Sequence, residues 1–158
     1  MNATILCVGK LKEDWQREGC AEYLKRLSRY GRYEIVQLDD ERETENASPA
    51  DIGRIIDKEG KAILARIRPN DRLIALCIKA QAPDSIALSK LGSEWSLDGK
   101  RNVFVIGGSN GLSNVVLARA NIKLSFSNLT FPHTLMRIIL LEQLYRAERI
   151  RTGEPYHK

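Results

Sequence analysis

The chain of 158 residues contains little cysteine and little histidine, and both scarcities exclude classes of protein. Its three cysteines, Cys7, Cys20 and Cys77, are odd in number and widely spaced, which fits neither a disulfide framework nor a paired-cysteine zinc site. Its two histidines, His133 and His157, have no carboxylate or cysteine nearby at the spacing of metal ligands. We therefore expect a protein without disulfides and without a metal.

Long apolar runs are also lacking. No uncharged apolar stretch is long enough to span a bilayer, and the first residues, MNATILCVGK, lack the basic start and apolar core of a secretion signal. Reduced thiols are the simplest interpretation of the cysteines, so we expect a cytoplasmic protein with no membrane partner. The length suits a single domain over residues 1–158.

The composition is that of an ordinary globular protein, with 43% hydrophobic and 28% charged residues. The formal net charge is +5. A basic surface attracts phosphate groups, so this charge favours a polyanionic partner, although many basic proteins bind no nucleic acid.

Short β-rich runs alternate with segments of helical period, which is typical of an α/β protein. Strands are expected at 3–8, 33–38, 71–79, 102–106 and 122–126. Helices are expected at 13–30, from Ser48 to about 67, at 84–95 and 113–120, and from Pro132 to just before Gly153. Two of the strands are apolar almost throughout, which predicts a mostly parallel sheet with helices on both faces. Ligands of such sheets bind outside the carboxyl ends of the strands.

The segment VFVIGGSNGLS places Gly107, Gly108 and Gly111 directly after an apolar strand. Without side chains, these residues let backbone groups approach a ligand closely. The segment is no phosphate-binding loop, because Leu112 stands where lysine would be required, and Ser109 interrupts a dinucleotide fingerprint. The alternative is a tight turn that needs glycine for a positive φ.

A second candidate loop, SFSNLTFPH at 125–133, follows the last expected strand. Its backbone atoms could wrap an adenine and a methionine. The alternative is that Ser127 or Thr130 caps the last helix. Another expected strand ends near Leu76 and Cys77, and this strand end lies on the same side of the sheet as the two loops. Alone, these two residues would be interpreted as core residues.

The C-terminal segment combines basic and aromatic side chains. The ring of Tyr156, the imidazole of His157 and the ammonium group of Lys158 could stack on a base, exchange a proton and meet a phosphate. A frayed terminus is the alternative. The last expected helix adds Arg137, Arg146, Arg149 and Arg151.

Several of these segments resemble the RlmH family of ribosomal RNA large-subunit methyltransferases, in the SPOUT superfamily. The most specific are FVIGGSNG at 104–111, TFPH at 130–133 and LEQLYRA at 141–147, and the resemblance extends from VGKLK at 8–12 to EPYH at 154–157.

The resemblance implies methyl transfer from S-adenosylmethionine to N3 of a pseudouridine in the 23S rRNA of assembled ribosomes. It also implies a homodimer and a deep C-terminal trefoil knot. By the family pattern, cofactor contacts fall on Leu76, Gly108, Ser127, Asn128, Leu129, Thr130, Phe131 and Pro132. On this basis we expect Gly108 to lie so close to the cofactor that Gly108→Leu excludes it while leaving the fold intact.

For the proton on N3, His157 is the first candidate acceptor and His133 the second. Tyr156 is expected to stack or donate a hydrogen bond, and Arg146 to position phosphate or stabilise the developing imide anion. Arg149, Arg151 and Lys158 are expected to contact RNA. The alternative function is a basic ribosome- or RNA-binding factor of the same fold without catalysis. A nucleotide-binding regulator is less favoured, since a phosphate loop is absent.

Overall fold

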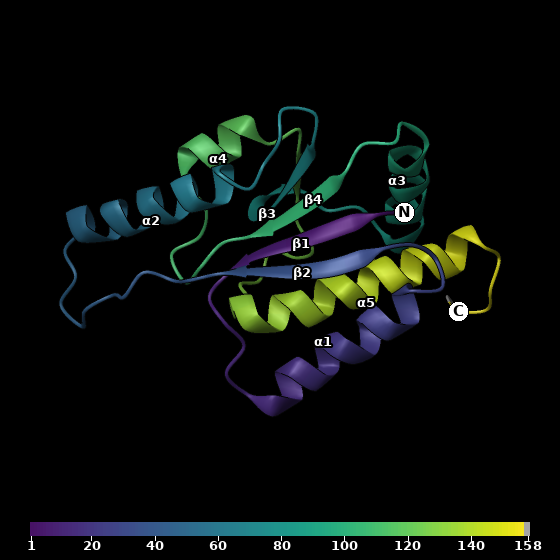
Figure 1. Cartoon of the computed structure of the whole chain (residues 1–158), viewed down its shortest axis with the longest axis horizontal. Helices are drawn as coiled ribbons and strands as arrows, with labels where there is room; N and C mark the ends of the chain where they lie inside the picture. The colour runs from purple at the N-terminus through teal and green to yellow at the C-terminus, as the bar shows by residue number, and fades with distance from the viewer. Residues whose placement is uncertain (157–158) are drawn as a thin grey trace.

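The computed structural model describes residues 1–156 and contains a five-stranded sheet in the order β2-β1-β4-β3-β5 (Figure 1). All neighbouring strands pair in parallel. The strands are β1 (Ala3–Val8), β2 (Tyr33–Leu38), β3 (Arg72–Gln81), β4 (Asn102–Ile106) and β5 (Ile122–Leu124). The helices are α1 (Asp14–Leu27), α2 (Pro49–Leu64), α3 (Ser85–Leu97), α4 (Asn114–Arg119) and α5 (His133–Arg151).

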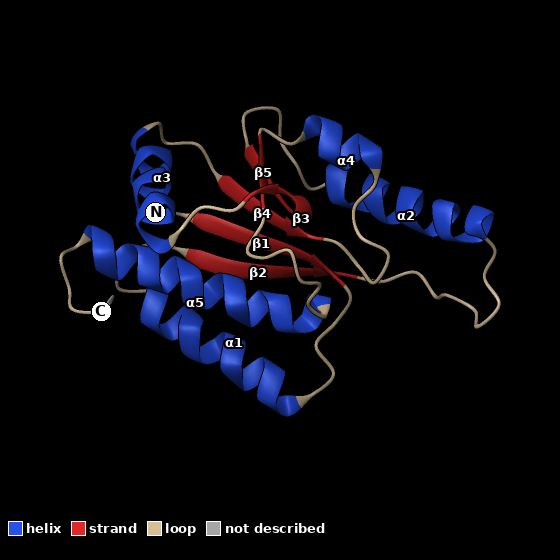
Figure 2. Ribbon diagram, turned by 180° about the vertical axis from the view of Figure 1, so that it is seen from behind, coloured by secondary structure: helices blue, strands red, loops and turns tan. Residues whose placement is uncertain are grey.

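Helices cover both faces of the sheet, with α1, α3 and α5 on one face and α2 and α4 on the other (Figure 2). Successive residues of a strand point to opposite faces. Accordingly, Ile5 packs in the cluster with α1, α3 and α5, whereas Leu6 packs in the cluster with Ile63 of α2 and Val116 of α4. The predicted parallel α/β architecture is therefore confirmed. The trefoil knot stays a prediction.

The central strands β1 and β4 are buried along their whole length, as their apolar sequences predict. The edge of the sheet differs from the prediction. β3 extends to Gln81, and its pairing with β5 shifts register between Leu76 and Gln81. β5 ends at Leu124, and the Ser125 amide donates to the carbonyl of Gln81 at 2.8 Å across this irregularity. Ser125 and Phe126 consequently belong to a loop.

Helix α2 begins as its sequence predicts, with the Ser48 side chain accepting a hydrogen bond from the Asp51 amide and Pro49 in the first turn. Near its other end, the helix packs closely on the start of α4. A Cβ atom on Gly60 would lie 2.2 Å from the Ser113 hydroxyl oxygen, which itself caps α4 by accepting from the Val116 amide. Within residues 1–156, no helix has the length and apolar character needed to cross a membrane.

The two glycines of α2 offer a matched test of this packing. Gly60→Ala should lower the free energy of unfolding by about 1–3 kcal/mol, because the methyl group displaces the capping hydroxyl of Ser113. Gly53→Ala, whose Cβ would meet nothing within 4 Å, should raise it by about 0.4–1 kcal/mol through helix propensity. Urea denaturation of both variants measures the difference, and equal effects would contradict the close packing.

Candidate functional site

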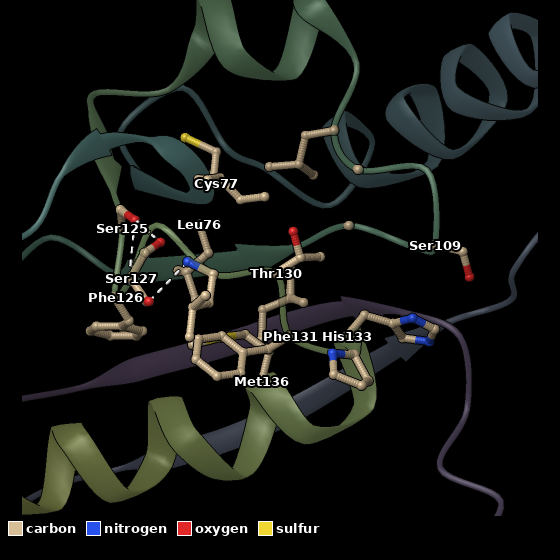
Figure 3. Close-up of a pocket in the computed structure, with 18 of the residues that line it drawn as sticks. Leu76, Cys77, Ser109, Ser125, Phe126, Ser127, Thr130, Phe131, His133 and Met136 are labelled. Atoms are coloured by element: carbon tan, nitrogen blue, oxygen red, sulfur yellow. Dashed lines mark hydrogen bonds between the residues drawn. The ribbon is translucent and has the colours of Figure 1, made fainter.

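A cavity of about 950 Å³ opens where the carboxyl ends of β3, β4 and β5 meet (Figure 3). Because the strands are parallel, segments that are distant in the sequence come together at this edge. Its walls are the end of β3, the glycine loop (residues 107–111) and the β5–α5 loop (residues 125–132). These are the three segments in which the sequence places its candidate ligand residues.

Seven of the eight predicted cofactor residues line the cavity, and Asn128 does not. The seven are Leu76, Gly108, Ser127, Leu129, Thr130, Phe131 and Pro132. Among the lining residues that sequence reasoning missed, Ile78 and Lys79 follow Leu76 in β3. Met136 lies one helical turn after Pro132, and this spacing is the signal that could have identified it.

The glycine loop is a tight turn as well as a cavity wall. The Gly111 amide donates to the Gly108 carbonyl at 3.1 Å, and Gly111 has a φ of +84°. A Cβ on Gly107 would lie 2.5 Å from the Gly111 carbonyl oxygen. Backbone crowding at Gly107 and the positive φ of Gly111 therefore explain these two glycines without a ligand. The loop can be a tight turn and a wall of the cavity at the same time.

Gly108 packs against α2 and β1 as well as lining the cavity. A Cβ at this residue would lie 2.9 Å from Oε2 of Glu59 and 3.2 Å from Cγ1 of Val8. A side chain on Gly108 would therefore point into the interface between α2 and the sheet. A leucine there would displace Glu59 and Val8, and the expectation that Gly108→Leu leaves the fold intact stays a prediction.

The β5–α5 loop is held by its own serines. The Ser125 hydroxyl donates to the Ser127 carbonyl at 2.9 Å, and the Ser127 hydroxyl accepts from the Leu129 amide at 2.9 Å (Figure 3). The alternative that Ser127 or Thr130 caps the last helix is wrong, since α5 follows Pro132 without any side-chain cap. Leu129 remains 70% exposed at the cavity, although it is a large apolar residue.

Helix α5 brings His133 to the cavity and Arg137 beneath it. The guanidinium of Arg137 is fully buried and donates to the carbonyls of Val8 at 2.8 Å and Gly9 at 3.0 Å. Burial and this neighbouring positive charge lower the pKa of His133, with Asp40 acting in the opposite direction. The imidazole is thereby biased towards its neutral form, which can accept a proton.

The thiols divide between the core and the cavity. Cys7 is buried, and burial raises its pKa to about 12, as expected of a core thiol. Cys77 is half-buried in the cavity wall, which corrects the interpretation of this residue as core. Burial raises the pKa of Cys77 too, so its thiol is a poor nucleophile. Residues 1–156 contain no cluster of three potential metal ligands.

Tyr156 packs against the end of α5. Its hydroxyl donates to Glu142 at 3.1 Å, its ring meets that of Tyr145 edge-on at 5.1 Å, and the Arg146 guanidinium lies 4.7 Å from its centroid. Burial, with the hydrogen bond to Glu142, raises the pKa of Tyr156 to about 12. The frayed-terminus alternative is therefore wrong up to Tyr156. His157 and Lys158 lie outside the described residues.

Tyr156 follows the end of α5, whereas the cavity lies at the start of this helix, where His133 and Met136 line it. This helix has 19 residues, so at 1.5 Å per residue about 27 Å separates its ends. Arg146 pairs with Glu142 at 2.8 Å, whereas Arg151 pairs with Glu148 near the helix end. Within one chain, the fold brings neither Tyr156 nor Arg146, Arg149 or Arg151 to the cavity.

Comparison with known proteins gives consistent results. A family model described as "Predicted SPOUT methyltransferase" matches residues 1–157. The ribosomal RNA large subunit methyltransferase H of Carboxydothermus hydrogenoformans is 52% identical, and that of Clostridium novyi is 54% identical, each over 100% of both chains. A probable methylase family protein from Haemophilus influenzae Rd KW20 shares the fold with a TM-score of 0.56 at 10% identity, covering 99% of this chain and 70% of that one.

His133 should titrate below its usual value of 6.5. Since the unfolded chain then binds the proton more readily, the free energy of unfolding should fall as the pH drops from about 6.5 towards the folded-state pKa. NMR of the ring signals measures the pKa. His133→Gln assigns it, because His157 is the only other histidine. A folded-state pKa at or above 6.5 would contradict the lowering by burial and by Arg137.

Proposed function

The chain belongs to the SPOUT methyltransferase family, and on this premise we propose that it transfers a methyl group from S-adenosylmethionine to N3 of a pseudouridine in 23S rRNA within assembled ribosomes. Membership of this family, with relatives at about 50% identity named as rRNA methyltransferases, makes the chain an rRNA methyltransferase. The observation that carries the finer proposal is the convergence of three separate segments on one cavity at the carboxyl edge of the sheet.

The cavity fits the proposed cofactor in size and chemistry. About 950 Å³ falls within the range of small-molecule sites, and Leu76, Phe126 and Met136 offer apolar surface for an adenine. The glycine loop and the β5–α5 loop add backbone amides and carbonyls for the ribose and the methionine end. We propose Leu76, Gly108, Ser127, Leu129, Thr130, Phe131 and Pro132 as its contacts, and a role for Asn128 stays a prediction.

When bound, S-adenosylmethionine supplies an electrophilic methyl group on a sulfonium ion. The protein must align the attacking N3 nitrogen with that methyl group and take up the N3 proton, which blocks the nitrogen lone pair. We propose His157 as the proton acceptor and Tyr156 as its stacking or hydrogen-bonding partner. Arg146 would position a phosphate or stabilise the imide anion, and the proposal uses no metal.

A homodimer would bring these groups together. Because α5 sets Tyr156 a helix length away from the cavity of its own chain, we propose that the tail (residues 156–158) of one copy acts at the cavity of the other. Apolar surface is available on the paired helices α1 and α5, where Trp15 is 54% exposed and Leu135, Ile138 and Ile139 are only partly buried. We propose that Arg149, Arg151 and Lys158 contact rRNA and that the enzyme works in the cytoplasm.

Two tryptophan substitutions in one loop test the cofactor site. Thr130→Trp should lower the affinity for S-adenosylmethionine at least tenfold, because Thr130 lines the cavity and the larger side chain would fill it. Asn128→Trp is the matched control, since Asn128 is exposed but does not line the cavity. Calorimetry measures both affinities. Equal affinities for the parent and both variants would place the cofactor elsewhere.

Deleting residues 156–158 should leave the affinity for S-adenosylmethionine unchanged and slow methyl transfer about a hundredfold to ten-thousandfold, the usual contribution of a positioned general base. Single-turnover transfer of a labelled methyl group to purified ribosomes measures the rate. An RNA-binding factor without catalysis would leave the rRNA unlabelled even with the parent chain.

Mixing the tail-deleted chain with the Thr130→Trp chain tests the dimer. A mixed dimer holds one intact cavity and one intact tail on different copies, so activity should reappear if the tail acts across the dimer. If the mixture stays inactive while sedimentation shows mixed dimers, the tail does not act across the dimer.

A further inference from the structure

A carboxylate lies buried behind the glycine loop. Glu59 of α2 is 6% exposed, and its Oε1 accepts a hydrogen bond from the Glu41 amide at 3.2 Å. Its Oε2 is buried and has no hydrogen-bond partner among residues 1–156. Burying a charge or a polar atom without a partner destabilises a fold, so such an atom next to a ligand cavity calls for an explanation.

Neighbouring contacts hold this carboxylate in place. Lys58 pairs with the Glu41 side chain at 2.8 Å, which ties α2 to the acidic loop (residues 39–46). The side-chain amide of Asn110 donates to the Glu43 carboxylate at 2.7 Å, which ties the same loop to the glycine loop. Gly60 packs directly on the start of α4, where the glycine loop ends. Glu59 thus sits at the junction of three segments.

Only the backbone of Gly108 separates Glu59 from the cavity. Gly108 lines the cavity, and a Cβ on it would lie 2.9 Å from Oε2 of Glu59. Away from solvent, charges interact more strongly than they do in water, so a charge on Glu59 is felt inside the cavity.

Within residues 1–156, no positive side chain pairs with Glu59. Burial raises the pKa of Glu59, and the carboxylates of Asp40 and Glu41 raise it further, while the hydrogen bond from the Glu41 amide opposes them. Lys58 is engaged by Glu41, and the Arg137 guanidinium is engaged by backbone carbonyls at the end of β1. Among the described residues, Glu59 therefore has no salt-bridge partner of its own.

We propose that Glu59 is a specificity-determining residue, whose negative charge acts across the backbone of Gly108 to favour the cationic methyl donor over its neutral product. This inference rests on the proposed function. S-adenosylmethionine and S-adenosylhomocysteine differ by one methyl group and by the positive charge on sulfur. Contacts with the adenine, the ribose and the amino acid end are common to both, so a buried negative charge distinguishes them. It would retain the donor and release the product.

The test is Glu59→Gln, which preserves the shape of the side chain and an oxygen acceptor for the Glu41 amide. Calorimetry with S-adenosylmethionine and with S-adenosylhomocysteine measures both affinities. The donor should bind on the order of tenfold more weakly than to the parent, as expected for losing one partly screened charge interaction, and the product should bind equally well. If Glu59 had a purely structural role, the substitution would lower the affinities for both ligands to the same extent.

A pH titration provides the second measurement. The ratio of donor to product affinity should rise with pH as Glu59 ionises, and this rise should be smaller in Glu59→Gln, where His133 still titrates in the cavity wall. Titration of the ammonium and carboxylate groups that both ligands share cancels from this ratio. The same titration in His133→Gln removes the contribution of that histidine, so a rise that persists there reports on Glu59 even if Glu59→Gln fails to fold.

Glu43→Gln is the control, because Glu43 is an exposed carboxylate of the same acidic loop. It should change the ratio less than twofold, as screened surface charges do. An unchanged ratio in Glu59→Gln, or a parent ratio that does not vary with pH, would overturn the inference. A parent chain that binds neither ligand would instead contradict the proposed function.

Discussion

The common direction of the five strands is the constraint on which the site depends. Parallel strands need long crossover connections, and these place helices on both faces while gathering the carboxyl-end loops at one edge. The glycine loop and the β5–α5 loop are separated by α4 and β5 in the chain, yet they form walls of one cavity. β1 and β4 are buried along their whole length and form the centre of the sheet.

Two separate packing constraints require glycine in the glycine loop. From within, Gly107 and Gly111 satisfy the geometry of a tight turn. From behind, Gly108 leaves room for Glu59 and Val8. The layer formed by α2 and α4, which does not line the cavity, therefore packs against the cavity wall at Gly108. Substitutions in α2 are expected to reach the ligand through this loop.

Helix α5 runs from the cavity at its first turn to the cluster around Tyr156 at its last turns. Its first turn carries His133 at the cavity, and Arg137 ties this turn to the end of β1 through backbone carbonyls. Its last turns carry the cluster in which Tyr156 packs on Tyr145. A rigid helix cannot bring its own ends together, which is why the proposed function uses a second copy of the chain to join the two regions.

Much was determined by the sequence alone. Apolar periodicity and capping residues identified the elements, and the position of the loops after strands identified the cavity segments, because these signals are local. The tertiary structure decided what depends on contacts between distant segments. It shortened β5 through the pairing with Gln81, excluded Asn128 from the cavity wall, turned Gly108 towards Glu59, and set Tyr156 a helix length away. Each of these outcomes rests on a neighbour that lies far away in the chain, which no local pattern can specify.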